Sequence, residues 1–152
     1  MPKYDVFDEA LIDAPPLVVY KAILDEYAGI TNWFLPILEF KLKGNMPIDR
    51  EGAMVNMIAH SHGVSLHETC KITKLVEAKS IEMDYSGDFV GIGTWTFEPS
   101  ADGKKTKMRF RWNVNVKKPI VVLLSPFVDG GKAHSEGMQK GFKACNSYLC
   151  KK

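Results

Sequence analysis

Residues 126–152 read PFVDGGKAHSEGMQKGFKACNSYLCKK, and this stretch decides the fold of the chain. Apolar side chains, with one histidine and one glycine among them, recur in it at steps of three or four residues: Phe127, Gly131, His134, Met138, Phe142, Cys145 and Leu149. This spacing places all of them on one face of an α-helix. We therefore predict one long helix over 126–152, with Ser125 as its N-cap and Pro126 in its first turn.

Most of the chain before this helix has the pattern of β-strands. Alternating apolar residues bounded by turn residues predict seven strands, at 3–13, 38–42, 54–60, 66–75, 81–85, 89–97 and 106–116. The turns are short and Asp102-Gly103 is a strong hairpin signal, so we expect antiparallel pairing. Ile72 and Leu75 are out of phase within their strand, which indicates a β-bulge.

Two short helices are expected between the first and second strands. A proline pair precedes the helical spacing of 17–25, and Pro36 ends a second helix over 28–34. A long helix with one apolar face needs a sheet to bury it. The sequence thus predicts a single α+β domain over 1–152, in which a curved seven-stranded antiparallel sheet wraps around the C-terminal helix.

Composition narrows the class of protein. The chain is 45% hydrophobic and 25% charged, as is usual for a globular domain, and its net charge of +2 is too small to indicate a nucleic-acid partner. The three cysteines, Cys70, Cys145 and Cys150, form no Cys-x-x-Cys pair, and the acidic N-terminus does not resemble a signal peptide. We expect a cytoplasmic protein. The sequence does not indicate its oligomeric state.

The order of elements and five local sequences resemble the START-like superfamily, also called the polyketide cyclase/dehydrase and lipid-transport (SRPBCC) superfamily. The matching stretches are 12–20 (IDAPPLVVY), 33–36 (WFLP), 87–95 (GDFVGIGTW), 111–114 (RWNV) and 124–126 (LSP) followed by His134-x-x-x-Met138-x-x-Gly141. The resemblance implies a helix-grip fold with an apolar cavity between sheet and helix. A related bacterial subgroup carries an Asn-His pair, whereas Ala133 precedes the histidine here.

Members of this superfamily hold lipids, sterols, polyketides, quinones or plant hormones, and a minority catalyse cyclisation, dehydration or hydrolysis. The resemblance therefore implies a carrier or sensor of a small hydrophobic ligand such as a lipid, quinone or polyketide. The alternative is a cyclase/dehydrase or small hydrolase that acts in the same cavity. An interaction module with a vestigial cavity is a third class, and fold alone does not choose among them.

His134 is the candidate polar anchor, because it is the one imidazole on the apolar face of the last helix. Glu68 shares a strand face with Cys70 and Ile72 by period two, and a Glu68–His134 pair would suit acid–base chemistry. The opposite register would place His67 inside instead, and the sequence leaves both registers open. These two residues, His134 and Glu68, are only weak catalytic candidates.

The expected walls of the cavity are the large side chains of the inward faces. We predict ligand contacts for Trp33, His67, Tyr85, Trp95, Phe110, Trp112, His134, Met138 and Phe142. His60, His62 and His67 cluster around one hairpin, but no carboxylate or cysteine completes a recognisable ligand spacing, so neither a metal nor another cofactor is expected.

The run from Ile120 to Leu124 has five consecutive apolar residues between a basic pair and the expected cap of the last helix. It is far shorter than the roughly 20 residues that span a membrane. In the expected fold it lies near the cavity mouth, where it could gate ligand entry or make a transient membrane contact. A buried strand end that leads into the helix is the other interpretation.

Overall fold

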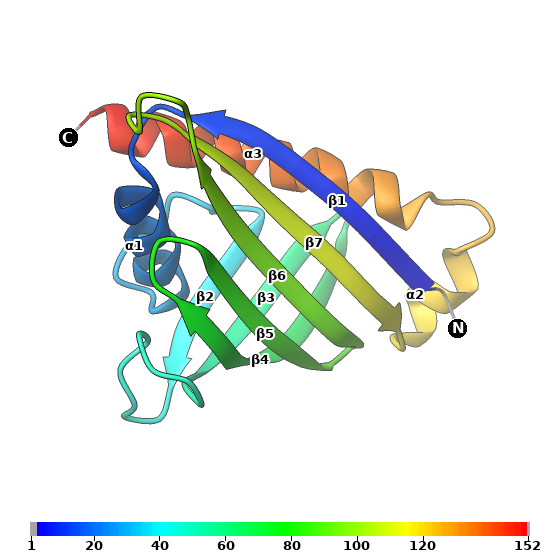
Figure 1. The fold of residues 1–152 in the computed structure, drawn as a ribbon. Coiled ribbons are helices and arrows are strands. Elements are labelled where there is room, and N and C mark those ends of the chain that lie inside the picture. The colour runs from blue at the N-terminus through cyan, green and yellow to red at the C-terminus, as the bar shows by residue number, and fades with distance from the viewer. Residues whose placement is uncertain (1–2, 152) are drawn as a thin grey trace.

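The computed structural model of the chain describes residues 3–151 and consists of a curved antiparallel sheet wrapped around one long helix (Figure 1). The elements follow in the order β1 (Lys3–Ile12), α1 (Pro16–Tyr27), β2 (Leu38–Lys43), β3 (Met54–Ser61), β4 (Val64–Val76), β5 (Ser80–Gly87), β6 (Phe89–Pro99), β7 (Thr106–Val116), α2 (Pro119–Leu124) and α3 (Gly130–Cys150). The predicted α+β fold, with its sheet and final helix, is confirmed.

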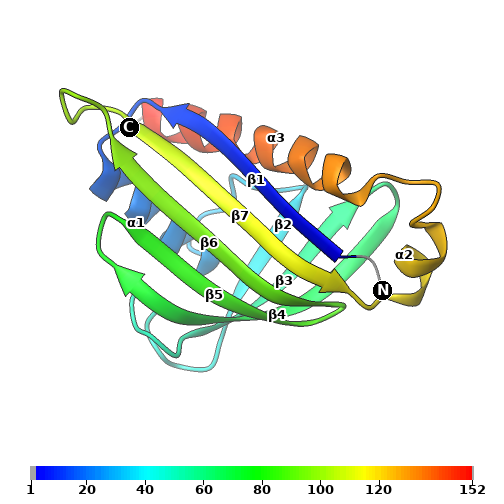
Figure 2. The same ribbon diagram turned by 45° about the vertical axis from the view of Figure 1, so that its right-hand side comes forward.

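The sheet has the strand order β1-β7-β6-β5-β4-β3-β2, and every neighbouring pair is antiparallel. Strands β2 to β7 therefore form one continuous meander, and β1 joins its far edge through β7. Figure 2 shows α3 running alongside β1, with the rest of the sheet curving beneath the helix. The inner face of the sheet and the apolar face of α3 bound one common interior.

The long helix begins four residues later than predicted. Asp129 is its N-cap, with a side chain that accepts a hydrogen bond from Lys132 N at 3.0 Å. Ser125 does not cap this helix, because its hydroxyl donates to the carbonyl of Val122, in the separate helix α2, at 2.8 Å. Phe127 therefore lies outside the apolar face of α3 and is 84% exposed.

The second short helix predicted at 28–34 is not formed; the chain makes turns there instead. Glu26, at the end of α1, is the physical reason. Its buried carboxylate accepts hydrogen bonds from Thr31 Oγ1 at 2.7 Å, from Trp33 N at 3.1 Å and from Phe34 N at 2.9 Å. Two of these bonds, from Trp33 N and Phe34 N, hold backbone groups that a helix would have paired internally.

Two local irregularities let the sheet curve. The pairing of β4 with β5 shifts between Ile72 and Lys74, which confirms the predicted bulge. On β6, Gly91 has a φ of +149°, and a side chain at this position would collide with the carbonyl of Asn113 on β7. Only glycine permits this conformation and this close approach of strands.

One end of the interior is filled by aromatic side chains. Trp95 contacts Phe110 and Phe142, with ring centroids 4.6 Å and 6.0 Å apart. Gly141 of α3 allows the ring of Phe34 to reach the helix backbone, since any side chain there would clash with that ring. Among residues 3–151, no helix is long and apolar enough to cross a membrane.

Candidate functional site

The other end of the interior is hollow. A cavity of about 470 Å³ lies between the N-terminal half of α3 and the sheet, and residues of all seven strands, of α1 and of α2 contribute to its lining. Its walls are mainly apolar, with Met57, Leu66, Phe89, Phe110, Val121 and Met138 among them. This volume lies within the range of small-molecule sites in proteins, about 300–1,000 Å³.

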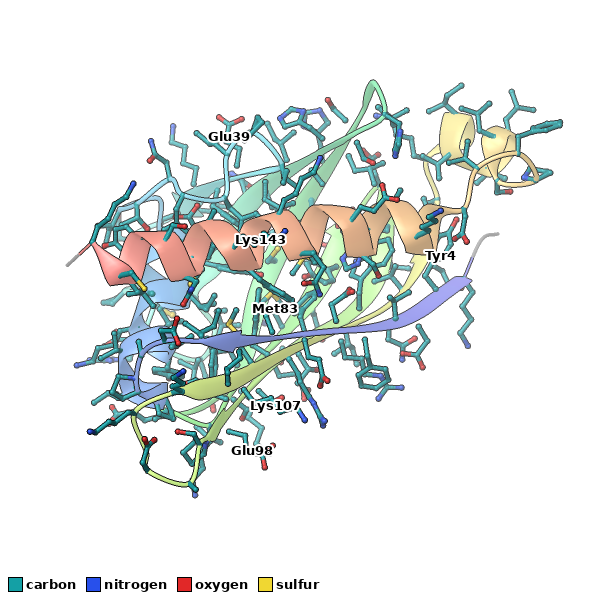
Figure 3. The ribbon with its side chains drawn as sticks, turned by 90° about the horizontal axis from the view of Figure 1, so that it is seen from above. Tyr4, Glu39, Met83, Glu98, Lys107 and Lys143 are labelled. Atoms are coloured by element: carbon teal, nitrogen blue, oxygen red, sulfur yellow. The ribbon has the colours of Figure 1, made fainter. Side chains whose placement is uncertain are left out.

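The mouth of the cavity lies among the lining residues that are exposed. These residues belong to the tip of the β3–β4 hairpin (His60, Ser61 and His62), to the end of α2 and the segment after it (Leu124 and Val128) and to α3 (Glu136 and Lys140). Seen from above, Tyr4 lies at the N-terminal end of α3, whereas Met83 lies beneath the helix further along (Figure 3). Tyr4 lines the cavity, and Met83 belongs to the filled core.

Five of the nine residues predicted to contact a ligand line the cavity: Tyr85, Phe110, Trp112, His134 and Met138. Trp95 and Phe142 face the same interior but belong to its filled end. Trp33 stacks on Phe34 outside the cavity, with ring centroids 5.2 Å apart. The ligand contacts themselves stay predictions.

The register of β4 places Glu68 inside and His67 outside. His67 is exposed on the outer face of the sheet and does not line the cavity, so the alternative that placed it inside is wrong. Its backbone N–H donates to Asp88 Oδ2 at 2.7 Å. The reason is the strict alternation of the strand, in which Glu68, Cys70 and Ile72 are the buried residues.

Glu68 is buried but does not pair with His134 as predicted. Its strand, β4, lies four places in the sheet from β1, the strand that runs alongside α3 and therefore alongside His134. The Glu68 oxygen Oε1 instead accepts a hydrogen bond from the backbone N–H of Phe89. The other oxygen, Oε2, is buried without a hydrogen-bond partner. Burial raises the pKa of this carboxyl to about 8, although the bond from Phe89 opposes the rise and the nearby Asp88 charge adds to it.

His134 lies at the edge of the cavity between an aromatic ring and a carboxylate. Its ring is parallel to that of Trp112, with centroids 4.0 Å apart and 1° between the planes. Nδ1 is 3.6 Å from Asp8 Oδ2, and both atoms are buried without a hydrogen-bond partner. Burial lowers the pKa of the imidazole, and the neighbouring Asp8 only partly offsets that effect.

Asp8 belongs to the candidate site but was not predicted from the sequence. It lies on β1 opposite Phe110 of β7 and is 7% exposed. The sequence does contain a signal for it, because Asp8 has the same alternation phase as the apolar residues Val6, Ala10 and Ile12. A carboxylate in the middle of an inward-facing set indicates a buried polar contact.

Two tyrosines bring hydroxyl groups to the cavity wall. The indole N–H of Trp95 donates to the hydroxyl of Tyr27 at 3.0 Å, and Tyr85 lines the same cavity. Burial raises the pKa of both tyrosines well above the ordinary value, so both are neutral at physiological pH. This part of the wall is therefore polar without being charged.

The sequence model of one protein family matches nearly the whole chain. The family is described as polyketide cyclase / dehydrase and lipid transport, and the match covers residues 5–149. The chain belongs to this family. Membership of the polyketide cyclase/dehydrase and lipid transport family agrees with the resemblance seen in the sequence.

Solved structures share the fold along the full chain. A protein of Thermus thermophilus has a TM-score of 0.77 at 19% identity, with 97% of each chain covered. A START superfamily protein of Mycobacterium smegmatis has a TM-score of 0.75 at 16% identity, with 99% of each covered. The Zhui aromatase/cyclase of a Streptomyces species has a TM-score of 0.71 at 11% identity, covering 97% of this chain and 93% of its own.

These identities establish the fold and nothing finer. A search of the curated proteins finds no match. Within the polyketide cyclase/dehydrase and lipid transport family, the ligand and any chemistry must therefore be argued from the site itself.

Proposed function

We propose that this protein binds a small hydrophobic molecule, such as a lipid, quinone or polyketide, in the cavity between α3 and the sheet, and acts as its carrier or sensor. The observation that carries the proposal is the hollow end of the interior. The same sheet and helix close tightly around Trp95 and Phe142, yet leave about 470 Å³ beside Trp112 and His134.

The free energy for such binding comes from burial of apolar surface. A ligand that buries about 300 Å² of apolar surface against the walls gains roughly 7.5 kcal/mol at 25 cal/mol per Å², before the costs of immobilisation. The walls are mainly apolar and can therefore bury such a surface, and their few polar groups can fix the orientation of the ligand. A cytoplasmic location is part of the proposal and is supported by three free cysteines.

Native mass spectrometry of the gently purified protein tests this function. We expect a fraction of the protein to carry an added mass, and organic extraction to release a hydrophobic compound. The protein stripped of that compound should take it up again in a one-to-one complex. A protein that stays unliganded with cellular extracts and with lipid, quinone and polyketide standards would contradict the proposal.

We further propose that the segment from Ile120 to Val128, beside the mouth of the cavity, contacts a lipid surface while a ligand enters or leaves. Four of its exposed apolar residues, Ile120, Leu123, Phe127 and Val128, are 42%, 70%, 84% and 42% exposed. The segment is thus neither the buried strand end nor part of the long helix. Exposed Lys117 precedes it, which suits an anionic lipid surface.

Co-sedimentation with vesicles of mixed neutral and anionic lipid tests this contact. Leu123→Ser combined with Phe127→Ser should lower the bound fraction several-fold. The matched control is Leu11→Ser combined with Phe7→Ser, because these apolar residues are 59% and 65% exposed on β1. Equal loss in both double variants, or none in either, would count against a specific lipid contact.

A second candidate function is catalysis in the same cavity, of the cyclase/dehydrase or hydrolase kind. The Asp8–His134 pair favours it, since a histidine held by a carboxylate is a frequent general base. Turnover of a hydroxylated polyketide-like substrate by the wild type, with loss in His134→Gln, would select the enzyme over the carrier. Tight binding without turnover would select the carrier.

A further inference from the structure

The buried pair beside Trp112 restricts the kind of ligand that the cavity takes. We infer that Asp8 and His134 make the site selective for a hydrophobic molecule that carries a hydroxyl group, phenol or alcohol, whose proton is donated to His134 Nε2. This inference rests on the proposed function, because it names the chemical class of the molecule bound in the same cavity.

Asp8 determines which ring nitrogen of His134 carries the proton. A neutral imidazole has one N–H donor and one bare acceptor nitrogen. Nδ1 faces Asp8 Oδ2 at 3.6 Å, and carboxylate oxygens accept hydrogen bonds. The proton is therefore favoured on Nδ1, which leaves Nε2 as an acceptor. Because burial lowers the pKa of His134, the ring is neutral at pH 7.

Access from the cavity distinguishes Nε2 from Nδ1. The His134 side chain is 16% exposed and lines the cavity. Nδ1 is among the buried atoms without a hydrogen-bond partner, whereas Nε2 is not, and no hydrogen bond of residues 3–151 uses Nε2. Nε2 is therefore the ring nitrogen that a molecule in the cavity can reach. The stack on Trp112 holds the ring plane and so fixes the direction of this acceptor.

Only a proton donor can satisfy an acceptor such as Nε2. A hydroxyl group donates a proton to it, whereas an ether or ketone has no proton to give. A carboxylate would bring its charge toward a bare lone pair and toward the buried Asp8 carboxylate, which is 7% exposed. The ring of Phe110, whose centroid is 6.0 Å from that of His134, adds apolar surface on the same side. The geometry thus favours a neutral donor on an apolar body.

Three matched probes test the inference by calorimetry on the stripped protein: 1-naphthol, 1-methoxynaphthalene and 1-naphthoate. The wild type should bind naphthol roughly tenfold more tightly than the ether, which is the worth of one net hydrogen bond. Naphthoate should bind most weakly. In His134→Phe the aromatic stack is retained but the acceptor is lost, so naphthol and the ether should bind equally.

Asp8→Asn gives an independent test if His134→Phe fails to fold. An amide at residue 8 can donate to Nδ1, which moves the proton to Nε2, so the preference for naphthol should shrink or turn toward the ether. Equal binding of naphthol and ether by the wild type, or a preference unchanged in a folded variant, would overturn the inference while leaving the proposed function intact. Failure of all three probes to bind would contradict the proposed function as well.

Discussion

Glu68→Gln should make the protein more stable at neutral pH, because glutamine is neutral at every pH whereas the buried carboxyl must hold its proton to stay neutral. The carboxyl is 4% exposed, and Oε2 has no hydrogen-bond partner. In the folded state its pKa is about 8, against an ordinary value of 4.5. A glutamine keeps an oxygen that can accept from Phe89 N, and its amide group replaces the protonated oxygen.

The sign of the effect follows from proton binding. Between pH 4.5 and pH 8 the unfolded chain loses the Glu68 proton and the folded chain retains it, so the free energy of unfolding falls as pH rises. With these two pKa values the wild type loses roughly 3 kcal/mol between pH 5 and pH 7.5 through this group alone. The glutamine variant has no such loss, because its side chain does not titrate.

Urea unfolding followed by circular dichroism at pH 5 and pH 7.5 measures the effect. The variant-minus-wild-type difference cancels all other titrating groups, and it should grow by roughly 3 kcal/mol in favour of Glu68→Gln at the higher pH. Glu98→Gln, an exposed carboxylate on β6, is the control and should show little change. A Glu68→Gln difference that is the same at both pH values would refute the reasoning.

Two further variants test what holds the fold in place. Glu26→Ala should lower the free energy of unfolding, measured by urea titration, by roughly 3 kcal/mol, because it leaves three donors in the turn after α1 without their acceptor. The control is Lys21→Ala, an exposed position on the same helix, which should change the free energy of unfolding little. Gly141→Ala should cost about 1–3 kcal/mol, because the ring of Phe34 occupies the space of the new methyl group; unchanged thermal stability would contradict that packing.

The fold was predictable because its two periodicities are clear in the sequence. Period two located all seven strands, and the steps of three and four located the final helix. The start of that helix was not predictable with the same accuracy, since Ser125 and Asp129 are both good caps. The choice between them depends on α2, whose carbonyl of Val122 takes the Ser125 hydroxyl.

The sequence predicted which residues face the interior, but not which of them lie beside the cavity. Alternation correctly placed Trp95 and Trp112 on the inner side of the sheet. It could not show that Trp95 lies in the filled end and Trp112 beside the cavity, because position along a strand relative to α3 depends on curvature and strand order. For the same reason the sequence pointed to Glu68 as the partner of His134, whereas the structure places Asp8 beside it.

The proposed ligand binding depends on the cavity beside His134, and a substitution that fills this cavity tests it most directly. Ala133 lines the cavity from α3, whereas Ala144 lies on the same helix, half-buried and outside the cavity. We would titrate 1-naphthol into the folded wild type, Ala133→Phe and Ala144→Phe by calorimetry. The account predicts one-to-one binding that is lost or weakened at least tenfold in Ala133→Phe alone. Equal affinity in all three proteins would contradict it.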